Sequence, residues 1–558
     1  FTSSVWAFLQ ENAWNADIYY RPLFTVLFML NYAIFGTMAW GWHLVNVLIH
    51  VVVTLMVFFT LSEAVERRWT ACIAASLFAV HPAHAESVAW ISGITDPLMG
   101  LFVLPAFYFY LRYRKAGKKC LLTLSLLFFF LALLCKETAI VLPIMIAYYE
   151  VVFLKDTTPI RTRLLRTISL LALYALPLLV YLPMRYLAIG GMFNRQGVKL
   201  LSGDWPLSVP LVAVKYLWLM VAPVGYSIQH YTTPVSSILS VGFIGPVIII
   251  AALTAGVILN RSHAVAFAAA WFVMWLLPPL AGLRAFDPLY FVQERYLYIP
   301  SIGFCFVVAA AVVWLAERRV FAGYGEWAGG IIFLALLIIY SAVSVKQNRV
   351  WHNSLTLLQN AVAVDPQSAY ARSALSTAYY AQGDLRAAKE TADMAIRLDP
   401  TCIDAYLNLS IYARRQGQLS EAIQILERAE KVAAESEPEA LHRVYRGLGI
   451  IYEQLKDLER AEQYLQQSVT SIPRPYAPNL YLLGEFYADN GRYEDARVTF
   501  EKILHMVPRR FAPIHLKLGR VYDRLGEKDK ARSAYEKYIE LVPYGRESSD
   551  IRRRLNSL

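Results

Sequence analysis

The sequence has few charged residues for its length and few cysteines. Lys, Arg, Asp and Glu together make up 17% of the 558 residues, and the mean hydropathy is +0.41. These values exclude an ordinary soluble protein of this size. The five cysteines show neither a disulfide framework nor the spacing of zinc ligands, so they do not indicate a redox compartment. The chain also shows no signal peptide and starts at Phe1, which predicts an interior piece of a longer protein.

The charge that is present is mostly basic, with a net value of +11. Many of the basic residues gather in short segments between apolar runs, at 67–68, 112–119, 161–166 and 318–319. Clusters of this kind mark the cytoplasmic loops of membrane proteins. The basic balance therefore does not predict a nucleic-acid partner.

The first 350 residues contain a series of apolar segments near the length that crosses a bilayer. We predict spans at 41–62, 70–80, 97–113, 120–135, 137–154, 167–188, 237–259, 264–282, 298–316 and 327–346. The short segment 22–36 predicts an interfacial helix. The segment 208–224 carries Lys215 and is interrupted by Pro210 and Pro223, which favours a re-entrant or surface helix.

This arrangement agrees with the distribution of charge. The loops 63–69, 112–119, 155–166, 260–263 and 317–326 fall on one side, and all the heavy basic clusters are among them. By the positive-inside rule this side is the cytoplasm. The segments 1–40, 81–96, 189–236 and 283–297, the Lys136–Glu137 turn and the C-terminal domain then lie on the opposite side.

Residues 351–558 contain a helical repeat instead of spans. The repeat is marked by prolines every 34 to 38 residues, at Pro366, Pro400, Pro438, Pro473, Pro508 and Pro543. In phase with them, turns are predicted at Gly383, Gly417, Lys456, Gly491 and Gly526, each followed five residues later by an alanine. These marks are typical of the tetratricopeptide repeat.

We predict two domains, 1–350 and 351–558, the second with about five repeats and a leading helix at 353–364. The longest spacing places a four-residue insertion between Gly417 and Pro438. Such repeats stack into an all-α solenoid whose groove suits extended peptides. A clamp for a substrate or partner and a scaffold for oligomerisation both remain open.

Three polar clusters lie on the predicted outer side, where ionisable groups beside apolar spans call for a functional explanation. In the first, His81, His84 and Glu86 lie within six residues and Asp96 follows. The spacing is not that of a zinc protease, and no metal ligand set or cofactor is predicted. General acid–base chemistry or a phosphate contact, and a polar helix end at the interface, are equally weighted alternatives.

The other two clusters are basic. Lys136-Glu137 stands between two apolar segments. The two residues could form an ion pair that holds a tight turn, or the lysine could lie near a lipid phosphate, and both interpretations remain open. Arg284 precedes Glu294-Arg295-Tyr296, and an arginine at this level is well suited to a lipid-anchored phosphate.

Taken in order, these segments resemble a known family. The matching motifs are Tyr20-Arg21-Pro22-Leu23, the His43–His50 segment, His81–Trp90, Lys136-Glu137, Glu294–Ser301, and Trp351 before the repeats. They are similar to those of the transmembrane and tetratricopeptide-repeat-containing O-mannosyltransferases and their bacterial relatives, which have the GT-C membrane glycosyltransferase fold. The resemblance spans nearly the whole chain.

The resemblance implies transfer of a sugar, usually mannose, from a polyprenyl-phosphate carrier to a Ser or Thr hydroxyl, with inversion at the anomeric carbon. It implies catalytic roles for His81, His84, Glu86, Asp96 and Glu294, and donor-phosphate contacts for Arg295, Lys136, Arg284 and Arg21. It places an acidic pair in the first outer loop, upstream of Phe1, and the repeats in the periplasm of a bacterium or, alternatively, in the lumen of the endoplasmic reticulum. Thr95 stands where relatives often have a basic residue, which shifts the phosphate contact towards Arg295 and Lys136.

Two other functions remain as alternatives. One is a non-catalytic membrane scaffold whose repeats recruit envelope or secretory partners. The other is a transporter, which is disfavoured because the ionisable residues gather at the outer ends of spans and no inverted repeat is visible.

Overall fold

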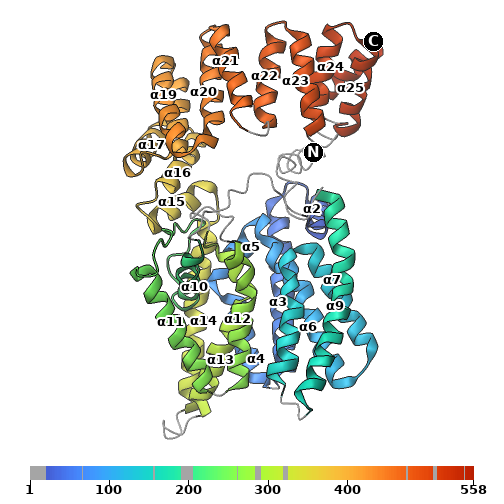
Figure 1. Cartoon of the computed structure of the whole chain (residues 1–558), viewed down its shortest axis with the longest axis vertical. Coiled ribbons are helices and arrows are strands. Elements are labelled where there is room, and N and C mark those ends of the chain that lie inside the picture. The colour runs from blue at the N-terminus through green and yellow to red at the C-terminus, as the bar shows by residue number, and fades with distance from the viewer. Residues whose placement is uncertain are drawn as a thin grey trace. The chain divides into compact units, whose positions relative to one another are not determined.

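The computed structural model describes residues 20–65, 67–154, 158–189, 205–260, 262–282, 291–317, 325–472, 476–506, 512–543, 545 and 547–558. They fall into two compact units, Ile18–Asp365 and Pro366–Leu558. All regular elements in these ranges are helical, and their single β feature is an isolated antiparallel bridge between His230 and Val292. The predicted all-α class is confirmed, with apolar helices followed by a solenoid (Figure 1).

The first unit is a bundle of apolar helices. It contains α2 (Pro22–Phe35), α3 (Ala39–Val65), α4 (Arg68–Val80), α6 (Thr95–Ala116), α7 (Lys119–Cys135), α8 (Val141–Tyr148), α9 (Ile160–Ile189), α10 (Trp205–Val221), α11 (Val241–Asn260), α12 (His263–Gly282), α13 (Ser301–Glu317), α14 (Gly325–Val350) and α15 (Ser354–Val364). Long helices such as α3, α6, α7 and α9 run side by side in Figure 1. Nine of the ten segments predicted as spans each overlap one α-helix, whereas 137–154 is divided into a 3-10 turn (Glu137–Ile140), α8 and a π-helical turn (Tyr149–Phe153).

Six helices in the described ranges are long and apolar enough to cross a membrane, namely 39–65, 91–116, 160–188, 241–260, 263–282 and 327–350. The outward faces of the most exposed ones are apolar. On α11, Ile248 is 61% exposed and Ile258 69%, and on α14 Ile331 is 65% exposed. Exposed apolar faces of this size suit lipid rather than water, so the unit is of the membrane type. The prediction that Pro210 interrupts its segment is wrong, because α10 continues through Pro210 and ends at Val221 before Pro223.

The second unit consists of five helix hairpins and a final helix in the described ranges. These are α16 (Ala369–Ala381) with α17 (Leu385–Leu398), α18 (Ile403–Arg415) with α19 (Leu419–Ser436), α20 (Leu441–Gln454) with α21 (Leu458–Thr470), α22 (Ala477–Asp489) with α23 (Tyr493–Met506), α24 (Ala512–Arg524) with α25 (Lys528–Leu541), and then α26 (Ser548–Ser557). The insertion predicted in the second repeat lengthens α19 to 18 residues. The leading helix is present as α15, which belongs to the unit Ile18–Asp365.

The turns inside the hairpins lie at the predicted residues, and their backbone is left-handed. Gly383, Gly417, Gly491 and Gly526 have φ values from 75° to 84°, and Lys456 has φ 64° at the same place in the third repeat. The alanines five residues later are buried, from Ala388 at 3% exposure to Ala531 at 0%. A Cβ on Gly449 or Gly519 would lie 2.7 Å from Leu465 or 2.5 Å from Tyr535, so the paired helices approach too closely for a side chain there.

Candidate active site

The charged residues of the bundle gather where α6 begins and α7 ends. Because these two helices are antiparallel neighbours, Asp96 in the first turn of α6 and Lys136 after α7 reach the same end of the bundle. Lys136 Nζ lies 2.7 Å from both carboxylate oxygens of Asp96. Both residues are buried, with 4% and 5% exposure. The lysine and the carboxylate, predicted separately, therefore form one buried ion pair.

A second ion pair joins residues that are 209 positions apart. Glu86 lies in the short helix α5 (Ala85–Ala89), and Arg295 lies in the 3-10 turn η7 (Glu294–Leu297) before α13. Arg295 Nη1 donates to Glu86 Oε1 at 2.6 Å, and the Arg295 backbone N–H donates to Glu86 Oε2 at 2.9 Å. Both oxygens of Glu86 are thus used to fix one arginine.

A third ion pair brings the start of α2 to the turn after α7. Arg21 donates from Nη2 and Nε to the two oxygens of Glu137, at 2.9 and 3.3 Å. We call Arg21–Glu137, Lys136–Asp96 and Arg295–Glu86 the three-pair cluster. Tyr296 links two of the pairs, since the Lys136 ammonium lies 5.0 Å and the Arg295 guanidinium 5.3 Å from its ring centre.

The pKa shifts follow from burial and from these partners. Burial lowers the pKa of Lys136, and Asp96 opposes that shift. Burial would raise the pKa of Glu137, but the Arg21 guanidinium outweighs it and holds this pKa at about 2. Burial would lower the pKa of Arg295, but the carboxylate of Glu86 outweighs it and raises this pKa. With each cation matched by one carboxylate, the three-pair cluster carries no net charge.

The candidate phosphate-binding residues differ in how far solvent reaches their side chains. The side chain of Arg295 is 24% exposed and that of Arg21 18%, whereas that of Lys136 is 6% exposed. The guanidinium of Arg295 also lies over Trp90, 5.5 Å from its ring centre, and Trp90 is 37% exposed. The guanidinium groups of Arg295 and Arg21 are accessible at this surface, whereas the Lys136 ammonium is covered and paired with Asp96.

The histidines of the first motif are buried and bonded within the chain. His81 accepts from the Ala83 backbone N–H through Nδ1 and lies 3.3 Å from the Met220 carbonyl oxygen through Nε2. Nε2 of His84 lies 2.9 Å from Ser301 Oγ. Burial lowers the pKa of both, that of His81 to about 4. Both rings are therefore neutral, and their geometry is that of groups that hold a turn.

Glu294 has a partner that the sequence did not reveal. Its Oε1 accepts from the Ser227 backbone N–H at 2.5 Å and lies 3.0 Å from His230 Nε2. Burial raises the pKa of Glu294 to about 7, and the hydrogen bond and charge of His230 oppose that shift. His230 belongs to no motif and lies 64 residues away, so no sequence signal pointed to it.

Arg284 lies outside the described residues. Asn46, which is 1% exposed, donates to the backbone carbonyls of Val88 and Trp90 at 3.2 and 3.4 Å, and so fixes the loop that carries Trp90. In the described ranges no three His, Cys, Asp or Glu side chains converge as metal ligands.

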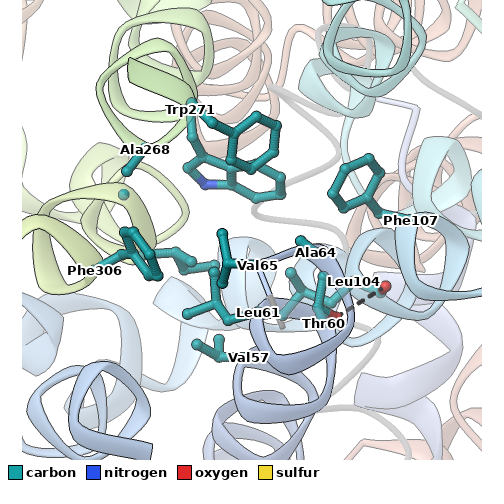
Figure 2. Close-up of a pocket in the computed structure, with 13 residues that line it drawn as sticks. Val57, Thr60, Leu61, Ala64, Val65, Leu104, Phe107, Ala268, Trp271 and Phe306 are labelled. Carbon is teal, nitrogen blue, oxygen red and sulfur yellow. Dashed lines mark hydrogen bonds between the residues drawn. The ribbon is translucent and has the colours of Figure 1, made fainter. Parts of the chain in front are cut away.

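Towards the middle of the bundle the lining becomes apolar. Figure 2 shows a pocket between α3, α6, α12 and α13, into which Leu61, Phe107, Trp271 and Phe306 project. Thr60 is its polar member, and its hydroxyl is hydrogen-bonded to the Leu104 carbonyl. None of the residues that line this pocket is titratable, so the pocket itself offers no acid, base or cation to a ligand.

Comparison with known families agrees with this division of the chain. Residues 21–184 match the dolichyl-phosphate-mannose-protein mannosyltransferase family, and residues 352–410, 401–472 and 481–546 match tetratricopeptide repeats. The first match contains Arg21, Glu86, Asp96, Lys136 and Glu137, but not Glu294 or Arg295.

Several curated proteins are similar over most of the chain. Protein O-mannosyl-transferase F38B6.6 of Caenorhabditis elegans is 27% identical over 69% of this chain and 55% of its own length. Human protein O-mannosyl-transferase TMTC3 is 25% identical over 81% of this chain and 54% of its own length. Protein O-mannosyl-transferase Tmtc1 of Drosophila melanogaster is 40% identical over 22% of this chain and 14% of its own length.

The chain spans about half the length of the first two relatives. It joins a membrane domain that matches the mannosyltransferase family to tetratricopeptide repeats, and this is the architecture of the transmembrane and tetratricopeptide-repeat-containing O-mannosyltransferases.

Proposed function

We propose that the protein is an integral-membrane glycosyltransferase that moves mannose from a polyprenyl-phosphate carrier to a hydroxyl of an acceptor protein. The observation that carries the proposal is Arg295, a partly exposed guanidinium fixed by the buried carboxylate of Glu86 at one end of an apolar bundle. The bundle matches the mannosyltransferase family, and the relatives are named protein O-mannosyl-transferases.

Arg295 is arranged to hold a phosphate that becomes a leaving group. Its side chain donates to Glu86 through Nη1, which leaves further N–H donors of the guanidinium for a ligand. Trp90 and Tyr296 lie against the guanidinium and limit its movement. An arginine held in this way can bind phosphate oxygens in a bidentate manner and stabilise the charge that develops as the bond to the sugar breaks.

In the transfer, the acceptor oxygen forms a bond to the anomeric carbon as the bond from that carbon to the phosphate oxygen breaks. The hydroxyl proton passes to a base, and the polyprenyl phosphate leaves with the electron pair. Glu86 and Asp96 are engaged by Arg295 and Lys136, so we assign them to positioning the cations rather than to proton abstraction. We assign the base to the acidic pair that the family resemblance places in the first outer loop.

The neutral charge of the three-pair cluster affects how the donor binds. An incoming phosphate adds negative charge to a site in which every cation already has a carboxylate. Binding is therefore accompanied by sharing of Arg295 and Arg21 between the phosphate and their carboxylates. The partly exposed arginines contact the phosphate directly, and the buried Lys136–Asp96 pair keeps its geometry.

We place this chemistry on the non-cytoplasmic side of the membrane. From Asp96 to Arg114, α6 extends about 27 Å at 1.5 Å per residue, close to the thickness of the hydrocarbon core. The basic loop that follows Arg114 belongs on the cytoplasmic side, so Asp96 and the cluster belong on the other. The repeats would bind the acceptor or a partner protein there, in the periplasm or the lumen.

The test is transfer of mannose from polyprenyl-phosphate-mannose to peptides by the reconstituted full-length protein. Arg295→Ala should lower the transfer rate by about 10²–10³-fold, the usual effect of removing one charge-stabilising donor. Arg68→Ala is the matched control, because Arg68 is an exposed arginine in the first turn of α4 and belongs to none of the three pairs. Unchanged transfer by Arg295→Ala would contradict the assignment of the phosphate. Absence of transfer from any donor sugar, with partner binding by the repeats retained, would favour the scaffold.

A further inference from the structure

The opposite end of the bundle contains a second charged group, which the proposed sugar transfer does not use. Its centre is Glu150, whose side chain is fully buried (0% exposed). Arg114, near the end of α6, lies with Nε 2.5 Å from Glu150 Oε1, and Arg166, in the first turns of α9, lies with Nη1 3.6 Å from Oε2. The Tyr110 hydroxyl also donates to Glu150. We call Glu150, Arg114 and Arg166 the Glu150 cluster.

The backbone around Glu150 has an unusual conformation that a third arginine stabilises. Residues Tyr149–Phe153 form a π-helical turn. Arg163 Nη2 donates to the carbonyl oxygens of Glu150 and Leu154, at 3.2 Å each, and to that of Val151. Single π-helical turns are frequent at functional sites. Arg163 is thus committed to the backbone, while Arg114 and Arg166 point their guanidinium groups at Glu150.

The two guanidinium groups remain accessible although their carboxylate is not. The side chains of Arg114 and Arg166 are 25% and 30% exposed. The segments 112–119 and 158–166 together contain eight lysines and arginines and no acidic residue. One buried carboxylate therefore orders two accessible arginines within a strongly basic surface, and this arrangement suits an anionic ligand.

The surroundings of these arginines are apolar on the side of α9. Ile160, Leu164, Leu165 and Ile168 are 57%, 45%, 57% and 61% exposed. Arg166 lies at the edge of this face, with Leu165 beside it and with Leu164 and Ile168 further round the helix towards the outside. The acyl chains of a lipid whose phosphate contacts the arginines can therefore continue over the exposed apolar face of α9. This combination suits a headgroup with attached acyl chains, whereas a soluble phosphate would gain nothing from the apolar residues.

We propose that Arg114 and Arg166, ordered by Glu150, bind the phosphate of an anionic phospholipid in the leaflet on this side of the membrane. The acyl chains of the lipid would lie along the exposed face of α9, against Leu165 and Ile168. The proposal concerns the end of the bundle opposite to the three-pair cluster and does not depend on sugar transfer.

The experiment compares lipid binding by the purified full chain and two variants that lose the same charge. Native mass spectrometry, with phosphatidylglycerol and phosphatidylcholine added at equal concentration, measures the bound fraction of each lipid. Arg166→Gln removes a guanidinium of the Glu150 cluster, and Lys119→Gln removes an exposed cation from the same basic surface. We expect the wild type and Lys119→Gln to prefer phosphatidylglycerol equally, within about twofold, and Arg166→Gln to lose about tenfold of that preference.

Three outcomes would overturn the proposal. Equal losses in Arg166→Gln and Lys119→Gln would mean that the surface attracts anionic lipid only through its general charge. Equal binding of the two lipids by the wild type would mean that no headgroup is selected. Displacement of the lipid by millimolar inorganic phosphate would assign the site to a soluble anion.

A second variant covers the case in which Arg166→Gln does not fold. Arg114→Lys keeps a positive charge beside Glu150 but removes the fork of N–H donors. We expect the stabilisation that phosphatidylglycerol gives to the thermal unfolding of the wild type to fall by more than half in this variant. An unchanged stabilisation would exclude Arg114 from the site.

Discussion

The three-pair cluster and the Glu150 cluster lie at opposite ends of α6 and are built on opposite principles. In the first, three cations meet three carboxylates one to one, and Lys136 and Asp96 are buried together. In the second, one buried carboxylate faces two arginines that solvent reaches. A balanced group keeps a fixed geometry and binds an anion only by sharing its cations. A group in which one buried carboxylate orders two accessible arginines can present their outer N–H donors to an anion without rearrangement.

The largest effect that tests this comparison should come from breaking the buried pair. Lys136→Met leaves the carboxylate of Asp96 buried without its cation, and loss of one partner of such a pair costs about 3–5 kcal/mol. Thermal unfolding followed by tryptophan fluorescence reports on the bundle, because the 13 tryptophans all lie at or before Trp351. The double variant Lys136→Met with Asp96→Asn removes both charges and should recover most of the loss. A double variant no more stable than Lys136→Met would show that the pair is not a unit.

The second effect concerns Glu294, which lies beside the three-pair cluster. Its carboxylate is paired with His230. Its pKa in the folded protein is raised to about 7, so between about pH 4.5 and 7 the folded state holds a proton that the unfolded state has released. Stability should therefore fall as the pH rises through this window, by up to about 3 kcal/mol. Unfolding of the wild type and Glu294→Gln at several pH values measures it, and Glu294→Gln should show a flatter profile. Identical profiles would exclude Glu294 as the titrating group.

The Glu150 cluster should be less sensitive to loss of its carboxylate. Glu150→Gln leaves Arg114 and Arg166 without their shared partner, but both are partly exposed and water can solvate them. We expect a loss of about 1–3 kcal/mol, the cost of an unsatisfied polar group rather than of a buried unpaired charge. The same fluorescence measurement applies. A loss as large as that of Lys136→Met would remove the distinction between the two ends.

The smallest effects test the repeats, where one turn differs from the others by a single residue. Lys456 has the left-handed backbone that glycine has in the other four turns, at a cost of about 1–2 kcal/mol for a residue with a Cβ. Lys456→Gly should stabilise its hairpin by up to about 1 kcal/mol, after the larger chain entropy of glycine is subtracted. Gly491→Ala should destabilise its hairpin by about 1 kcal/mol, although a Cβ there meets no atom within 4 Å. Hydrogen exchange of peptides from α20–α23 measures both, and changes of the same sign would contradict the backbone explanation.

The sequence predicted those features that repeat or that depend on local composition. The apolar segments, the five turns of the hairpins and the lengthened α19 all follow from patterns within one or two helices. The break expected at Pro210 does not occur, since this proline lies inside α10, where it removes one backbone hydrogen bond but does not end the helix.

The site was predictable as a set of residues but not as a set of pairs. Arg295 and Glu86 are 209 residues apart, and nothing in either motif says that one will hold the other. The same is true of His230 and Glu294, which meet through the bridge between His230 and Val292. Ionisable residues at helix ends can be recognised from sequence, but their partners depend on which helices become neighbours. The roles of these residues in sugar transfer remain predictions.

The position of α15 bears on how the protein can be divided for study. The Asn360 side chain donates to the Tyr226 carbonyl at 2.8 Å, and Trp351 stacks on Trp90 with ring centres 6.1 Å apart. A fragment cut after Val350 would lose both contacts and uncover the indole that lies against Arg295. A bundle fragment that ends at Asp365, and a separate repeat fragment that begins at Pro366, would keep each set of contacts whole.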